Sequence, residues 1–205
     1  MDTKTDLSTN SVSIDKAQFD QWFDERYELK KQHERDTSTG SLSIIATKGT
    51  MDMAYPPFIL ASTAAALDWD VSVFFTFYGL ELLKSEVNLK VSPLGNPAMP
   101  MKMPVGPEWF KEIDWPIPNI LMSNVPGFEQ LASTLMKKTV ESKGIAGIVE
   151  LRDACLEGGV ELIACQMTVD LFGQKKEEFI PEVNQWVGAA TFLPTAREAD
   201  ICLFI

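Results

Sequence analysis

The sequence predicts a three-layer α/β/α domain, in which helices cover both faces of a mainly parallel sheet, with a helical extension before it. Several short runs, such as 42–47 and 160–164, are apolar along most of their length, which is typical of strands buried on both faces. Segments with apolar residues at helical spacing lie between these runs, and this alternation favours a parallel sheet. The length of 205 residues suits one such domain. We place the N-terminal tail, helix and linker at 1–41 and the α/β domain at 42–205.

The N-terminal extension should contain one helix. Residues 1–13 are polar and rich in Ser, Thr and Asp, so we expect them to be disordered. A charged helix should run from Asp15 to about Arg35, since Asp15 and Gln18 have the spacing of a capping box. Its apolar residues fall on one face, which must dock on the main domain or on a neighbouring subunit. This aromatic stripe consists of Phe19, Trp22, Phe23 and Tyr27.

The first half of the main domain reads as strand, helix, strand. Leu42–Thr47 is the first buried strand, and the loop Lys48–Tyr55 follows it. Pro56 and Pro57 suit a first helical turn, because the N–H groups of that turn have no partner within the helix. The helix that they begin should extend to about Leu67. We then expect a strand at 71–77, a short helix at 79–84 and a third strand at 89–93.

Residues 93–118 are unusually rich in proline and methionine. The prolines exclude regular structure, whereas the methionines and Trp109 argue against full solvation. A long irregular segment of this composition is usually functional or part of an interface. Its methionines at 99, 101 and 103 would either cover a reactive group or fill a subunit contact. Together with the aromatic stripe, this segment predicts a homo-oligomer.

The second half of the main domain continues the alternation of helices and strands. An amphipathic helix spans Phe128 to Thr139. A second helix has its apolar face between Ile145 and Cys155, and the glycines at 158 and 159 end it. Three further elements follow in order: a strand at 160–164, a short helix at 166–172 and a last strand at 201–205.

Charge and composition exclude several classes of function. The chain has 18 basic and 29 acidic residues, a net charge of −11, which repels nucleic acid and argues against nonspecific binding to it. The sequence has one histidine, His33, so Ser-His-Asp hydrolysis and multi-histidine metal sites are nearly excluded. We expect the His33 side chain to be solvated. The sequence has no G-x-G-x-x-G or Walker motif. We therefore expect neither a metal nor a cofactor.

The three cysteines, Cys155, Cys165 and Cys202, form no C-x-x-C pair, which excludes a disulfide framework and fits a reducing compartment. No signal peptide is evident, and the longest apolar stretches, around 58–67 and 71–80, are far shorter than a membrane span. These observations predict a cytoplasmic protein with no integral membrane span.

Two loops are candidates for a binding site, because ligands of parallel sheets bind beyond the carboxyl ends of the strands. They are Lys48–Tyr55 and Cys165–Thr168. Cys165 ends a strand and precedes a helix, where free N–H groups and the helix dipole would stabilise a thiolate or a persulfide. The alternative is that Cys165 is a small buried hydrophobic residue. Cys155 and Cys202 are expected to lie in the core.

Five segments resemble the DsrE/DsrF-like sulfur-carrier family, and in particular its branch labelled as peroxiredoxin-like DsrE proteins. The resemblance covers about residues 42–205 and leaves out the extension. The Thr-x-x-x-Cys surroundings of true peroxiredoxins are absent around Cys165. The similar segments are 42–52, 74–80, 95–101, 164–170 and 199–205.

The resemblance implies a three-layer α/β/α fold, homo-oligomers, and sulfane sulfur held on a cysteine as a persulfide or thiosulfonate. It also implies exchange of that sulfur with TusA-like carriers or rhodaneses, and the sulfur-bearing cysteine of the family maps onto Cys165. A sulfurtransferase or sulfur carrier is thus favoured over the two alternatives, a thiol peroxidase and a noncatalytic oligomeric binding module. The expected substrate-binding residues come from the two loops: Lys48, Gly49, Gln166, Met167 and Thr168.

Overall fold

The computed structural model describes residues 15–37, 39–92, 102, 106–113, 126–183 and 185–205. The chain forms two compact units, Met1–Thr39 and Gly40–Ile205. Two of the predictions concern the tail at 1–13 and the segment at 93–118. The tail and most of that segment lie outside the described residues. None of the helices among the described residues is both long enough and apolar enough to cross a membrane.

The first unit contains the predicted helix, α1 (Lys16–Thr37), whose aromatic stripe is exposed. The rings of Phe19, Phe23 and Tyr27 follow one another along the helix, with centroids 6.3 Å apart at each step. The Phe19 N–H donates to the carbonyl oxygen of Asp15, so the first turn begins where the capping residue was expected. What covers the stripe stays a prediction.

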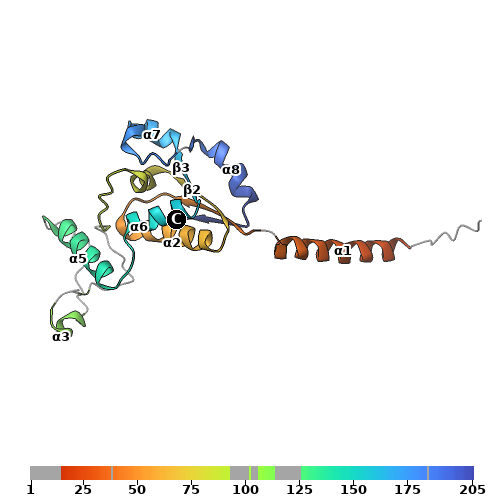
Figure 1. Cartoon of the computed structure of the whole chain (residues 1–205), viewed down its shortest axis with the longest axis horizontal. Helices are drawn as coiled ribbons and strands as arrows, with labels where there is room; N and C mark the ends of the chain where they lie inside the picture. The colour runs from red at the N-terminus through yellow and green to blue at the C-terminus, as the bar shows by residue number, and fades with distance from the viewer. Residues whose placement is uncertain (1–14, 38, 93–101, 103–105, 114–125, 184) are drawn as a thin grey trace, which may run out of the picture. The chain divides into compact units, whose positions relative to one another are not determined.

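The second unit is built on one sheet of five strands, all of them parallel, in the order β4-β3-β2-β1-β5. This arrangement confirms the α/β fold. Figure 1 labels two of these strands, β2 and β3. Strand β1 lies between β2 and β5: it pairs with β2 over all six residues of both strands and with β5 over residues 42–45. The strands are β1 (Ser41–Ala46), β2 (Asp70–Phe75), β3 (Glu161–Cys165), β4 (Gln185–Val187) and β5 (Ile201–Phe204).

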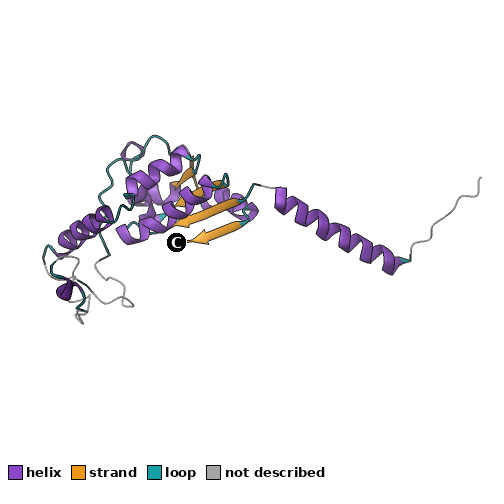
Figure 2. Cartoon of the chain, turned by 60° about the horizontal axis from the view of Figure 1, so that its bottom comes forward, coloured by secondary structure: helices purple, strands orange, loops and turns teal. Residues whose placement is uncertain are grey.

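Helices cover both faces of the sheet, because alternate side chains of each strand point to opposite faces. On one face, α2 (Met51–Ala66) and α6 (Ile148–Glu157) cover the main core, where the rings of Phe58 and Phe75 lie 5.9 Å apart. On the other face, α8 (Ala189–Glu198) packs through Phe192, which stacks on Phe74 at 4.6 Å. The helices and strands of these layers are visible in Figure 2.

The remaining described elements are short, apart from α5. They are η1 (Phe77–Leu83), α3 (Glu108–Lys111), α5 (Phe128–Ser142), α7 (Gln166–Phe172) and η2 (Lys176–Glu178). The one-turn helix α3 shows that proline density does not exclude regular structure throughout 93–118, since Pro107 precedes its first residue and so removes none of its hydrogen bonds.

The start of one helix, α2, was predicted wrongly near two prolines. The helix expected to begin at Pro56 begins at Met51, because Met53 and Ala54 already donate to the carbonyl of Thr50. Both prolines therefore lie within the helix, and burial of Pro57 offsets the backbone hydrogen bonds that they remove.

Three strand predictions also need correction. The strand expected at 71–77 ends at Phe75, because Phe77 has a positive φ of 50° and turns the chain into η1. The described residues 89–92 form no strand, and the N–H of Val91 instead donates to Ser133 Oγ. Cys202 is exposed rather than buried, because β5 lies at the edge of the sheet.

Candidate functional site

Cys165 lies at the junction of β3 and α7, as the sequence predicted. It is the last residue of the strand and the residue that precedes the first turn of the helix. Its side chain is 3% exposed and packs in the smaller core between the sheet and α8, together with Phe74 and Phe192. The thiol is therefore shielded from bulk solvent, although it lies at the carboxyl end of the sheet, where α/β proteins bind ligands.

Two threonine hydroxyls lie beside the sulfur. Thr168, in the first turn of α7, is fully buried, and Thr76 follows the end of β2. Their Oγ1 atoms are 3.1 Å apart, and Thr168 Oγ1 also accepts the N–H of Phe77 at 3.4 Å. The ends of β2 and β3 are neighbours in the sheet, so the strand order brings these two hydroxyls to Cys165.

The pKa of the Cys165 thiol lies below its ordinary value. Burial acts to raise the pKa, because it penalises the thiolate, but hydrogen bonds to the sulfur outweigh this effect. The hydroxyls of Thr168 and Thr76 contribute most, followed by the backbone N–H groups of Thr168 and Met167. The direction predicted from the helix N-terminus is thus confirmed, while the larger contribution comes from threonine hydroxyls.

The other predicted residues of the Cys165 loop differ in what they do. The Met167 side chain is exposed, and its backbone N–H is the group that faces the sulfur. The Gln166 side chain donates to Asp170 Oδ1 at 2.8 Å and so braces the first turn of α7. Among these residues, Thr168 alone reaches Cys165 through both its side chain and its backbone.

Lys48 and Gly49 lie after β1, and the end of β2 separates that position from Cys165. Lys48 is exposed, and no hydrogen bond or ion pair joins it to Cys165 among the described residues. Gly49 packs tightly against η1, where an added Cβ would lie 2.3 Å from the carbonyl oxygen of Tyr78. Close approach of two backbones accounts for this glycine, and its proposed contact with substrate stays a prediction.

Sequence analysis missed the contribution of the segment after β2. Thr76 faces the sulfur, and Phe77 adopts its positive φ directly after it. The order of the strands would have indicated this contact, because neighbouring parallel strands end side by side, but the sequence did not give that order. Exposed apolar side chains adjoin the site on η1 and α7, and we call them the apolar rim. The apolar rim consists of Phe77, Tyr78, Met167, Leu171 and Phe172.

The other two cysteines have different surroundings. Cys155 is fully buried under α2, where its Sγ–H donates to the carbonyl oxygen of Phe58 at 3.5 Å. Burial raises the pKa of Cys155 to about 11, so it is a thiol at neutral pH. Cys202 is exposed on β5. Cys165 therefore differs from both by combining burial with several donors aimed at its sulfur.

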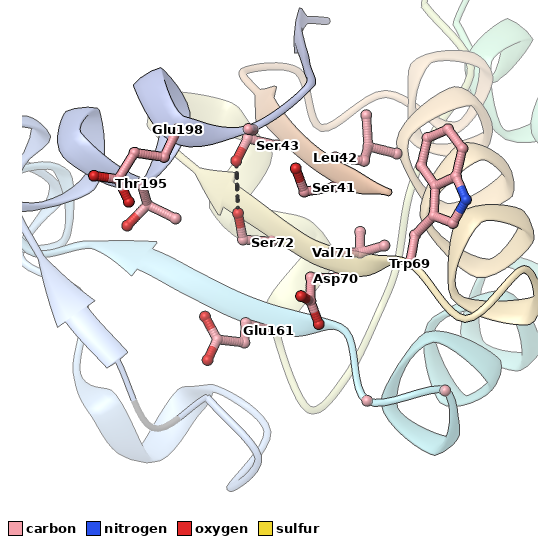
Figure 3. Close-up of a pocket in the computed structure, with 13 residues that line it drawn as sticks. Ser41, Leu42, Ser43, Trp69, Asp70, Val71, Ser72, Glu161, Thr195 and Glu198 are labelled. Carbon is pink, nitrogen blue, oxygen red and sulfur yellow. Dashed lines mark hydrogen bonds between the residues drawn. The ribbon is translucent and has the colours of Figure 1, made fainter. Parts of the chain in front are cut away.

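Two hollows of the second unit lie away from Cys165. One, of about 570 Å³, lies at the amino ends of the strands, where Asp70 and Glu161 begin β2 and β3 (Figure 3). In Figure 3 the buried hydroxyls of Ser43 and Ser72 face each other and hydrogen-bond at 2.8 Å. The other hollow, of about 680 Å³, is lined by residues of α2, α5 and α6. Neither hollow is lined by Cys165. The candidate site is the junction of β3 and α7, because the hydrogen-bond donors converge on a buried thiol there.

Comparison with known proteins gives one family. Residues 38–204 match the DsrE/DsrF/DrsH-like family. A relative from Allochromatium vinosum, named "Sulfur carrier protein DsrE2", is 55% identical over 164 residues, which cover 80% of this chain and 97% of the relative. A second relative, "Uncharacterized protein YrkE" from Bacillus subtilis, is 29% identical over 168 residues, covering 82% of this chain and 98% of that protein.

Proposed function

The chain belongs to the DsrE/DsrF/DrsH-like family, as its sequence motifs predicted, and we propose that it is a sulfur carrier that holds sulfane sulfur on Cys165. The observation that carries this proposal is the junction of β3 and α7. There a buried cysteine receives hydrogen bonds from two threonine hydroxyls and two backbone N–H groups. The same donors suit a persulfide, because its outer sulfur is also an anion.

Loading begins with attack of the Cys165 thiolate on the sulfane sulfur of a donor persulfide, R–S–SH. The new S–S bond forms to Cys165 as the S–S bond of the donor breaks, and the donor leaves as the thiolate R–S⁻. Delivery repeats this exchange in the other direction: an acceptor thiolate takes the outer sulfur and returns Cys165 to its thiolate. Neither step changes the combined oxidation state of Cys165 and its donor or acceptor, so no additional oxidant or reductant is required.

The sulfur donor and the sulfur acceptor are expected to be proteins that bind to the apolar rim. Because Cys165 is almost fully buried, a partner must approach from the side of Phe77 and Met167, which are exposed beside it. A TusA-like carrier or a rhodanese would supply or receive the sulfur. The family also supports a homo-oligomer, and a free thiol as the working group favours a reducing cytoplasm.

Intact-mass measurement after incubation with polysulfide tests the assignment to Cys165. The wild-type chain should gain the mass of one or more sulfur atoms, and a reducing thiol should remove it. Cys165→Ser should abolish the gain, while the matched variants Cys155→Ala and Cys202→Ser should retain it. Normal loading of a folded Cys165→Ser protein would reject the assignment.

A parallel incubation with peroxide separates sulfur transfer from the other two functions. A gain of oxygen on Cys165 at low peroxide, without a gain of sulfur from polysulfide, would indicate a thiol peroxidase. No covalent change under either condition would indicate a binding module. For a sulfur carrier, we expect sulfur loading to be complete at polysulfide concentrations well below the peroxide concentration needed to oxidise Cys165.

A further inference from the structure

The outer edge of β5 is an open strand edge in the part of the second unit that the structure describes. Among the described residues β5 pairs with β1 alone, and β5 ends the strand order (Figure 2, the strand nearest the C mark). Its side chains are unusually exposed for an apolar strand: Ile201 is 40% exposed, and Phe204 is 75% exposed. An exposed, apolar edge of this kind is a template for another β-strand.

The hydrogen bonds of β5 show which backbone groups face outward. Ile205 donates its N–H to the carbonyl of Ile45 and accepts the N–H of Thr47, both at 2.8 Å, so its polar groups face β1. Successive residues of a strand direct these groups to alternate sides. Leu203 therefore also faces β1, while the N–H and C=O groups of Cys202 and Phe204 face the open edge.

The opposite edge of the same sheet is protected, which makes the open edge of β5 more informative. At that edge, β4 has only three residues, and the Lys176 ammonium lies 4.9 Å from the ring centroid of Trp186. Short length and a cation are devices that discourage edge pairing. By contrast, β5 has no charge, no proline and no such cover within Ile201–Phe204.

We propose that two copies of this chain pair through β5, antiparallel, across a twofold axis that passes beside Leu203. This register places Cys202 of one copy opposite Phe204 of the other, twice, and both residues have their backbone groups outward. Each such pair can exchange two hydrogen bonds, for about four in all. A twofold axis beside Cys202 would leave only one such pair within the strand.

The second copy is the occupant because the strand is complementary to itself. Ile201–Phe204 carries no charge, so antiparallel pairing with the same segment meets no electrostatic repulsion. Cys202 pairs in register with Ser43, and Phe204 with Ile45, so both side chains lie on the α8 face of the sheet. In the proposed register each Phe204 covers Cys202 of the second copy, and the two sheets continue as one. The inference concerns assembly and does not depend on sulfur at Cys165.

Disulfide cross-linking of the full-length chain tests the register. In a background where Cys155 is alanine and Cys165 and Cys202 are serine, a cysteine is introduced at one position at a time. Leu203→Cys should cross-link two copies most efficiently, because residues opposite each other lie about 4.5 Å apart, within disulfide range. The native Cys202, restored alone, should cross-link poorly, since diagonal neighbours are about 7–8 Å apart. No cross-link at any position from 201 to 204, or the strongest one at another position, would overturn the proposal.

Light scattering on chains with their native cysteines gives an independent measurement. At about 50 µM, the wild-type chain should have at least twice the mass of one chain. Phe204→Lys should halve that mass, because it sets two lysines at the open edge. Leu131→Lys is the matched control: it replaces another exposed apolar residue, on α5, and should leave the mass unchanged. A monomeric wild type, or an unchanged mass for a folded Phe204→Lys variant, would contradict the pairing.

Discussion

The Thr168→Val substitution should raise the pKa of the Cys165 thiol and slow its alkylation at neutral pH. Burial acts to raise the pKa of Cys165, and the Thr168 hydroxyl is the largest effect that opposes it. A hydrogen bond to a charged group contributes about 1.5–3 kcal/mol, and about 1.4 kcal/mol corresponds to a factor of ten in an equilibrium constant. Because the backbone donors remain, the thiolate fraction below the pKa should fall by roughly tenfold, near the lower end of this range.

The rate of alkylation by iodoacetamide, measured against pH, provides the test. Every protein compared also carries Cys155→Ala and Cys202→Ser, so that alkylation reports on Cys165 alone. The inflection of the rate profile should move to higher pH in Thr168→Val, while Thr168→Ser keeps a hydroxyl and should stay close to the parent. An unchanged profile in a folded Thr168→Val protein would refute the hydrogen-bond explanation. Valine has nearly the volume of threonine but also removes the acceptor of the Phe77 N–H, so the test requires evidence that the Thr168→Val protein is folded.

Three further predictions concern other parts of the second unit. Cys155 should resist iodoacetamide at pH 8 in the native protein and react only in denaturant, since it is buried and its pKa is about 11. Phe58→Ala should lower the free energy of unfolding by about 3–5 kcal/mol, whereas Ile59→Ala, at an exposed position, should cost less than about 1 kcal/mol in urea denaturation. Gly49→Ala should lower the free energy of unfolding by about 1–3 kcal/mol, because its Cβ would lie 2.3 Å from a backbone carbonyl oxygen. Gly188→Ser, where the added side chain enters open space, should be nearly neutral. Equal urea midpoints for the two variants would contradict the packing argument.

The parts of the fold that the sequence predicted well are those with strong local signals. The end of β3 and the whole of α7 match the expected strand at 160–164 and helix at 166–172 to within a residue. The glycines at 158 and 159 separate α6 from the apolar run at 160–164, and this run of five residues is too short for a buried helix. Local composition was sufficient there because each element begins and ends within a few residues of its signal.

The elements that sequence analysis missed have weak or contrary local signals. The strand β4 has three residues, one of them glutamine, and its pairing with β3 decides its conformation. Helix α8 contains Pro194, which argues against a helix when the sequence is considered alone. The Cys202 prediction failed for a different reason: an apolar run indicates a strand, but the strand order decides whether the strand is central or at an edge.

The candidate site was predicted in part for the same reason. Cys165, Met167 and Thr168 are adjacent in sequence, so the helix that follows β3 was enough to place their donors near the sulfur. Thr76 follows the end of another strand, β2, and is 92 residues from Thr168, so only the adjacency of β2 and β3 brings their hydroxyls together. Contacts of this kind follow from topology, which a single sequence specifies only indirectly.

The three cysteines of this chain differ in burial and in hydrogen bonding, the two properties that we propose a sulfur-carrying cysteine requires. Cys155 is buried without the threonine donors, and burial raises its pKa to about 11, so it is protonated and a poor nucleophile at neutral pH. Cys202 is exposed, and a persulfide there would meet every thiol in solution. Cys165 is as shielded as a core residue, yet its donors hold its pKa below the ordinary value. We propose that its thiolate reacts mainly with a reagent that contacts the apolar rim, which would favour transfer between proteins over loss to small thiols.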